Sequence, residues 1–139
     1  MNFACLCLLF LQICLVKSEI LNSAELLQKC KNEVDASEED VKMIIERKMP
    51  TSYGGLCLLA CLYENSGIIQ NGKFVIENLN KAIETGAVAI GGKVAKQYIN
   101  EINQDCKDIE NDDKCVLAKE IIMCAAESIT RNLNLNKEL

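Results

Sequence analysis

The stretch Gly55–Glu64, GLCLLACLYE, places two cysteines four residues apart within an apolar run. Such a pair can bind a metal, carry out redox chemistry or anchor disulfides. An α-helix turns by about 100° per residue, so Cys57 and Cys61 would share one face of a helix and could not bond to each other without distorting it. If these cysteines form disulfides, each therefore needs a partner elsewhere in the chain.

The first residues have the pattern of a secretory signal peptide. Residues 3–16, FACLCLLFLQICLV, form an apolar run that is long enough for a signal-peptide core. The run is shorter than the roughly 20 apolar residues of a membrane-spanning helix, although a membrane anchor is the alternative. Val16 and Ser18 supply small side chains before the expected cleavage site. The sequence thus predicts a signal peptide over residues 1–18 and one mature domain over residues 19–139, secreted to the extracellular space without membrane insertion.

The cysteine count favours a disulfide framework. Three of the nine cysteines lie in the expected signal peptide, and the mature chain keeps Cys30, Cys57, Cys61, Cys106, Cys115 and Cys124. An even number of cysteines in a small secreted chain is typical of a domain held by disulfides. The chain has no His and no Cys-x-x-Cys pair, so we expect no metal site, no redox site and no cofactor.

Apolar residues recur at three- and four-residue spacing along the mature chain, which predicts an all-α single domain without a convincing strand. About six helices are expected from this spacing and from the capping and turn residues between them, over residues 22–33, 37–49, 52–65, 74–84, 93–108 and 114–129. Cys115 and Cys124 would lie on opposite faces of the last helix and could not pair with each other. Excluding this pair and the Cys57–Cys61 pair still leaves several disulfide pairings open.

The cysteine spacing of the mature chain is Cys30-x26-Cys57-x3-Cys61-x44-Cys106-x8-Cys115-x8-Cys124. It resembles the insect odorant-binding proteins of the pheromone- and general-odorant-binding family. The resemblance covers the whole mature chain, and the x3 and final x8 spacings are its tightest features. The x44 segment is slightly longer than is usual for the family, and we expect the extra residues around positions 86–92.

The resemblance implies a pairing and a function. The family's interlocked disulfides correspond here to Cys30–Cys61, Cys57–Cys115 and Cys106–Cys124. In the family, the helices enclose an apolar cavity that carries small hydrophobic molecules such as odorants or pheromones through aqueous lymph to a membrane odorant receptor. Such a cavity is physically reasonable, because crosslinks can offset the core packing that a cavity gives up.

The expected ligand-binding residues are apolar side chains on inward helix faces. From their positions we select Leu56, Leu59, Tyr63, Ile68, Phe74, Val94, Tyr98, Ile102, Ile121, Ala125, Ile129 and Leu133. Ordinary core packing is the alternative role for each of them. A buried phenol needs a hydrogen-bond partner, so the three tyrosines, Tyr53, Tyr63 and Tyr98, are the expected polar contacts of a ligand.

Composition and cysteine placement argue against other classes of function. A net charge of −5 without a basic block disfavours nucleic-acid binding. Without His, the usual hydrolase mechanisms lack their base, so no enzyme is expected, and no side chain is expected to titrate near neutral pH as a release switch. A saposin-like lipid-binding module would cluster its cysteines near the chain ends. A salivary or venom effector on the same scaffold is the serious alternative, and a homodimer is compatible with the sequence.

Overall fold

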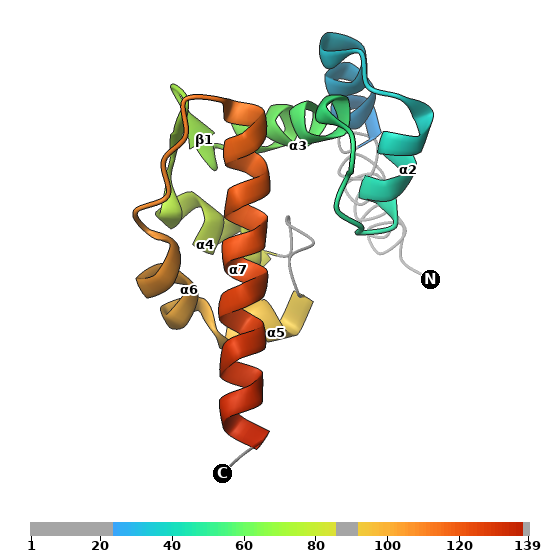
Figure 1. The fold of residues 1–139 in the computed structure, drawn as a ribbon. Coiled ribbons are helices and arrows are strands. Elements are labelled where there is room, and N and C mark those ends of the chain that lie inside the picture. Colours follow the sequence, from blue (N-terminus) through green and yellow to red (C-terminus); the bar gives the residue numbers. More distant parts are fainter. Residues whose placement is uncertain (1–23, 86–91, 138–139) are drawn as a thin grey trace, which may run out of the picture.

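The computed structural model describes residues 24–85 and 92–137 of the chain. The predicted signal peptide lies outside these ranges, and so do positions 86–91 of the segment 86–92 in which the extra residues are expected. The described elements are a helix over residues 24–34, α2 (Glu38–Ile45), α3 (Tyr53–Asn65), β1 (Ile69–Gln70), β2 (Lys73–Phe74), α4 (Ile76–Thr85), α5 (Gly92–Gln97), α6 (Ile99–Cys106) and α7 (Lys114–Lys137) (Figure 1). The predicted all-α class is confirmed, with one short antiparallel hairpin added.

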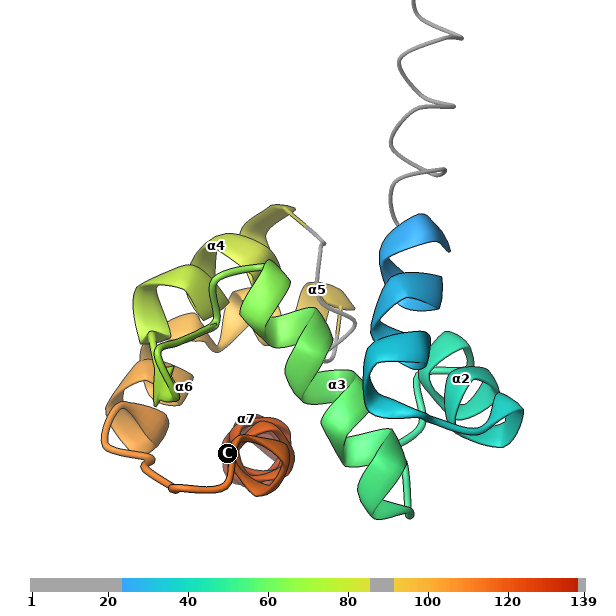
Figure 2. The same ribbon diagram turned by 90° about the horizontal axis from the view of Figure 1, so that it is seen from above.

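Helix α3, which holds the GLCLLACLYE stretch, lies at the centre of the fold. In Figure 2, residues 24–34 and α2 lie on one side of α3, and α4, α6 and α7 lie on the other. On the first side, Leu58 and Cys61 join Cys30 and Ala36 in what we call the N-terminal cluster. The stretch is apolar around its circumference because a helix that is buried on two sides has no need of a polar face.

The opposite side of α3 belongs to a larger hydrophobic core, which we call the main cluster. Helices α3 and α7 pack extensively against each other along it, and α6 packs on α7 (Figure 1). Its buried members are Leu59, Ala60, Tyr63, Ile68, Ile69, Leu79, Ala82, Ile83, Ala95, Tyr98, Ile102, Cys106, Cys115, Leu117, Ala118, Ile121, Ala125 and Ile129. The two sides of α3 therefore divide the described interior into a small and a large apolar region.

Three disulfides connect the elements of these clusters. They join residues 24–34 to α3 (Cys30–Cys61), α3 to α7 (Cys57–Cys115) and α6 to α7 (Cys106–Cys124), with Cα–Cα distances of 5.6, 4.4 and 5.9 Å. These are the pairs that the family resemblance implies. The bonds close loops of 31, 58 and 18 residues. Because each loop limits the conformations of the unfolded chain, each bond should stabilise the folded state by about 3–4 kcal/mol on the chain-entropy estimate.

Several local signals in the sequence mark the boundaries of these elements. Ser37 opens α2 with a reciprocal capping box, in which its hydroxyl accepts from the Asp40 backbone and the Asp40 side chain accepts from the Ser37 backbone. The Ser52 side chain caps α3. Beyond α3, Gly67 has a φ of 78°, a conformation that glycine adopts without strain. The Asn71–Gly72 turn has φ values of 52° and 73°, as a tight hairpin between two strands requires.

Three predictions about the elements were wrong. The helix expected over residues 93–108 is two helices, α5 and α6, separated at Tyr98. Phe74 belongs to β2, whose two residues are too few to show an alternating pattern, and the following helix begins at Ile76. Residues 130–137 continue α7, since no Gly or Pro ends the helix and Thr130 and Asn132 bond to backbone carbonyls one turn earlier.

Candidate functional site

The main cluster gathers most of the side chains that the sequence nominates for ligand binding. Leu59, Tyr63, Ile68, Tyr98, Ile102, Ile121, Ala125 and Ile129 are buried members of it, and Leu56 and Phe74 are half-buried and pack against it. They come from α3, the hairpin region, α6 and α7, which are far apart in the sequence. The structure therefore brings ten of the twelve candidates into one apolar region.

Val94 and Leu133 lie outside the main cluster, with exposed fractions of 37% and 38%. Val94 lies on the outer side of α5, where the neighbouring Ala95 takes the buried position. Leu133 lies in the last turns of α7, which extend beyond the rest of the fold in Figure 1. Leu133 is therefore part of α7, which continues to Lys137.

Buried members of the main cluster on α4 and near the start of α7 are not among the residues that the sequence nominates. Leu79, Ala82 and Ile83 are buried on α4, and Leu117 and Ala118 are buried on α7. The apolar spacing of Leu79 and Ile83 on one helix face is the signal that identifies the α4 group. Leu117 and Ala118 directly follow Cys115 and Val116, and no feature of that run distinguishes them from the other apolar residues of the helix.

The three tyrosine hydroxyls have different environments. Tyr53 is exposed, and its hydroxyl donates to Asp113 Oδ2 at 2.8 Å. Tyr98 is buried, and its hydroxyl accepts a hydrogen bond of 2.8 Å from Asn136 Nδ2 on the last turn of α7. Tyr63 is 4% exposed, and its buried hydroxyl has no partner in the described part of the chain. Desolvation by burial raises the pKa of Tyr63, which keeps the phenol neutral.

Two further buried polar atoms in residues 24–85 and 92–137 also lack hydrogen-bond partners. These atoms are Asn80 Oδ1 on α4 and Asn103 Oδ1 on α6. Buried polar atoms are nearly always hydrogen-bonded in folded proteins, so each such atom calls for an explanation. Together with Tyr63, they place the unsatisfied polar groups on α3, α4 and α6, three helices that build the main cluster.

The N-terminal end of α3 is held by a buried carboxylate. Asp40 accepts hydrogen bonds from the Ser37 backbone (3.0 Å), the Ser37 hydroxyl (2.8 Å) and the Ser52 hydroxyl (2.5 Å). The hydrogen bond from Ser52 lowers the pKa of Asp40, and the bonds from Ser37 lower it further. Desolvation of the carboxylate opposes these effects without outweighing them. This network fixes α2 against the start of α3, since Ser52 also caps that helix.

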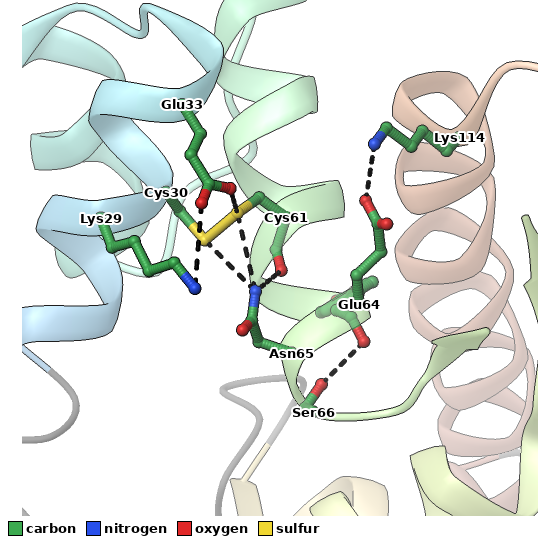
Figure 3. Close-up of a disulfide and its surroundings, with 9 residues drawn as sticks. Lys29, Cys30, Glu33, Cys61, Glu64, Asn65, Ser66 and Lys114 are labelled. Carbon is green, nitrogen blue, oxygen red and sulfur yellow. Dashed lines mark hydrogen bonds and ion pairs between the residues drawn. A yellow bond between two sulfur atoms is a disulfide. The ribbon is translucent and has the colours of Figure 1, made fainter. Parts of the chain in front are cut away.

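The other end of α3 is tied to both neighbouring parts of the fold (Figure 3). Asn65 Nδ2 donates to the Cys61 carbonyl at 2.8 Å and lies 3.7 Å from both sulfurs of the Cys30–Cys61 disulfide. Glu64 forms an ion pair of 2.8 Å with Lys114 at the start of α7. The hydrogen bond to Glu64 raises the pKa of Lys114. Helix α3 is therefore held at both ends by polar contacts, while its middle packs into the two clusters.

A polar surface cleft of about 470 Å³ lies between the hairpin and the connection from α6 to α7. It is lined by Asn71, Gly72, Lys73, Phe74, Lys107, Asp108, Ile109, Glu110, Asn111 and Asp112. Phe74 is the member of the nominated ligand-binding set that borders it. Because most of its lining is charged or polar, this cleft differs from the apolar cavity that the resemblance implies.

Within residues 24–85 and 92–137, no group of three or more His, Cys, Asp or Glu side chains is placed to hold a metal ion. No helix in the same ranges is both long and apolar enough to cross a bilayer.

Comparison with known proteins gives consistent matches. The chain matches the model of the PBP/GOBP family over residues 16–128. It is 32% identical over 110 residues to general odorant-binding protein 28a of Drosophila melanogaster, an alignment that covers 77% of this chain and 73% of that protein.

Two solved structures have a similar fold. Odorant-binding protein dmelOBP28a from Drosophila melanogaster superposes with a TM-score of 0.65 and 26% identity, over 84% of this chain and 96% of that one. Fatty acid binding protein OBP56a from the oral disk of the blowfly Phormia regina gives a TM-score of 0.62 and 15% identity, over 82% and 94% of the two chains. At 15% identity, the second match supports the shared fold alone.

Proposed function

Since the chain belongs to the PBP/GOBP family of odorant-binding proteins, which carry hydrophobic ligands and are not enzymes, we propose that it binds small apolar molecules within the main cluster. It then carries them through an aqueous extracellular fluid to a membrane receptor. Odorants, pheromones and similar molecules are the ligands we propose. The names of its relatives refer to odorants and, in one case, to fatty acids.

The observation that carries this proposal is the convergence of ten sequence-nominated side chains on the main cluster. These side chains are aliphatic or aromatic, so they favour an apolar ligand by removing its surface from water. Within the described ranges, the buried residues with charged or polar side chains are Asp40 and Ser128, and each is hydrogen-bonded, Asp40 to Ser37 and Ser52 and Ser128 to Asp105. A site with this composition suits binding by shape and hydrophobicity.

Secretion forms part of the proposal. The apolar run at residues 3–16 is the sequence feature behind it, and three disulfides are typical of oxidising, extracellular compartments. We propose cleavage after Ser18. Mass spectrometry of the protein from secreting cells tests this assignment: a chain beginning at Glu19 supports it, and a chain that keeps residues 1–18 contradicts it.

Two adjacent leucines of α3 allow a matched test of the site. Leu59 belongs to the main cluster and Leu58 to the N-terminal cluster, and both are buried. Leu59→Ala and Leu58→Ala each remove the same atoms and should destabilise the fold by comparable amounts, about 2–5 kcal/mol. Displacement of a fluorescent apolar probe by a panel of volatiles and fatty acids is then measured for each variant.

We expect Leu59→Ala to change the order of ligand affinities and Leu58→Ala to preserve it. Equal effects of the two substitutions would place the ligand elsewhere. If no apolar compound displaces the probe from the wild-type protein at micromolar concentration, the carrier function itself is wrong.

A further inference from the structure

Within the described part of the chain, the Tyr63 hydroxyl is a buried hydrogen-bond donor without an acceptor. The side chain is 4% exposed, it belongs to the main cluster, and no partner for its oxygen exists among the described residues. By contrast, the hydroxyl of Tyr98 in the same cluster is paired with Asn136. The difference isolates Tyr63 as the phenol whose hydrogen-bonding capacity the folded chain leaves unused.

An unused donor at this position has an energetic consequence. Burying a hydroxyl without a partner destabilises a fold, whereas phenylalanine at the same position would fill nearly the same volume without that cost. A molecule that enters the main cluster and offers an acceptor to this hydroxyl would recover the lost interaction. A pure hydrocarbon would not recover it.

We propose that Tyr63 donates a hydrogen bond to a neutral oxygen-bearing ligand, such as an aldehyde, ketone or ester, and so selects these molecules over hydrocarbons of the same length. This selection rests on the proposed function, because it requires a ligand within the main cluster. Tyr63 lies one turn beyond Leu59 on the same face of α3, so its ring and the aliphatic side chain border the same apolar region.

The surroundings of Tyr63 also disfavour a charged ligand. The side chains that form the main cluster with Tyr63 are apolar, so a carboxylate among them would be surrounded by groups that carry no charge. Desolvation of an unpaired carboxylate in such a region costs several kcal/mol, far more than one phenol hydrogen bond returns. Burial raises the pKa of Tyr63, so its hydroxyl stays protonated and available as a donor. An ionised fatty acid should therefore bind less tightly than the corresponding aldehyde.

The test uses octane, octanal and octanoate, which share a chain length and differ at one end. Their dissociation constants are measured near neutral pH for the wild-type protein, for Tyr63→Phe and for Tyr53→Phe, whose phenol is exposed and lies outside the main cluster. For the wild type we expect octanal to bind most tightly. Tyr63→Phe should weaken octanal binding by about three- to tenfold, the range of one net hydrogen bond, and leave octane binding unchanged. Tyr53→Phe should alter neither affinity.

Thermal unfolding without ligand separates a ligand contact from a structural role. Tyr63→Phe should unfold at the same or a higher temperature than the wild type, because it removes an unpaired hydroxyl. Tyr98→Phe should unfold at a lower temperature, because it leaves the Asn136 amide without its acceptor. A clear destabilisation by Tyr63→Phe would overturn the proposal, since it would mean that the hydroxyl has a partner, such as a bound water, in the free protein.

A measurement on the wild-type chain removes any dependence on the folding of a variant. With tyrosine labelled at Cζ with ¹³C, the Tyr63 resonance should shift on binding octanal and stay nearly in place on binding octane. Equal shifts with both ligands, or equal affinities of wild type and Tyr63→Phe for octanal, would overturn the selection while leaving the carrier function intact. Failure of octane and octanal alike to bind would instead refute the proposed function.

Discussion

Two neighbouring glycines in the first turn of α3 should respond in opposite ways to alanine. A Cβ at Gly54 would find its nearest atoms at 3.8 and 3.9 Å, which is ordinary packing distance. A Cβ at Gly55 would lie 2.5 Å from the Pro50 Cβ and 2.6 Å from Asp40 Oδ1. The close approach of Asp40 in the first turn of α2 and of Pro50 in the connection to α3 therefore requires a glycine at position 55, while no such contact exists at position 54 among the described residues.

The magnitudes follow from these distances. Gly54→Ala should stabilise the protein by about 0.5–1 kcal/mol, as replacing a helical glycine usually does. Gly55→Ala gains the same stabilisation from replacing a helical glycine, but the crowding of its Cβ against Pro50 and Asp40 costs about 1–3 kcal/mol of stability. It also displaces the Asp40 carboxylate from the Ser52 hydroxyl, a loss of about 1.5–3 kcal/mol for a charged hydrogen bond. The net expectation is a destabilisation of about 2–5 kcal/mol.

Urea unfolding followed by far-UV circular dichroism, with the disulfides intact, measures both variants on one scale. The double variant Gly55→Ala/Asp40→Ala provides a check, because the cost of Gly55→Ala should fall once the carboxylate is absent. A Gly55→Ala protein as stable as Gly54→Ala would refute the reasoning, as it would show that α2 and α3 do not meet closely around this glycine.

Other consequences concern the carboxylates, the disulfides and the response to pH. The hydrogen bond from Ser52 lowers the folded-state pKa of Asp40. The ionised carboxylate therefore stabilises the fold above the ordinary pKa of an aspartate, and this contribution is lost as the pH falls through the lowered value. Asp40→Asn should be less stable than wild type at neutral pH, and urea unfolding should show the difference in stability between the two proteins shrinking in acid. Removing the α3–α7 bond with Cys57→Ala/Cys115→Ala should cost about 4 kcal/mol in the same assay, and an unchanged urea midpoint would argue against this tether. The chain has no His, and the hydrogen bond from Tyr53 lowers the pKa of Asp113. NMR spectra at pH 7 and pH 6 should therefore nearly coincide. A large rearrangement of the end of α7 between these two pH values would contradict the expectation.

The sequence was most informative where a local rule determines the structure. Ser37, Ser52 and Gly67 mark helix boundaries through side-chain capping and a positive φ, which depend on few neighbours. The cysteine spacing was informative in a different way, because helical geometry left several pairings open and the family resemblance was needed to choose among them.

Predictions failed where distant parts of the chain decide the structure. No breaking residue marks the end of α5, and the break at Tyr98 accompanies a hydrogen bond between that tyrosine and Asn136, 38 positions later. The exposure of Leu133 could not be read from its apolar neighbours, because it depends on how far α7 extends beyond the helices that cover its first turns. Among the described residues the Tyr63 hydroxyl has no partner, and this too is a property of the packed helices that has no counterpart in the sequence.

The most direct test of the central claim is a methyl NMR titration of the wild-type protein with octanal. Leu59, Ile102 and Ile121 report on the main cluster, and Leu58 and Val41 report on the N-terminal cluster across α3. If the ligand binds where we propose, saturable shifts will appear for the first group and will be small for the second. Shifts confined to the N-terminal cluster, or no saturable shift in either group, would contradict the proposal that this protein carries its ligand between α3, α6 and α7.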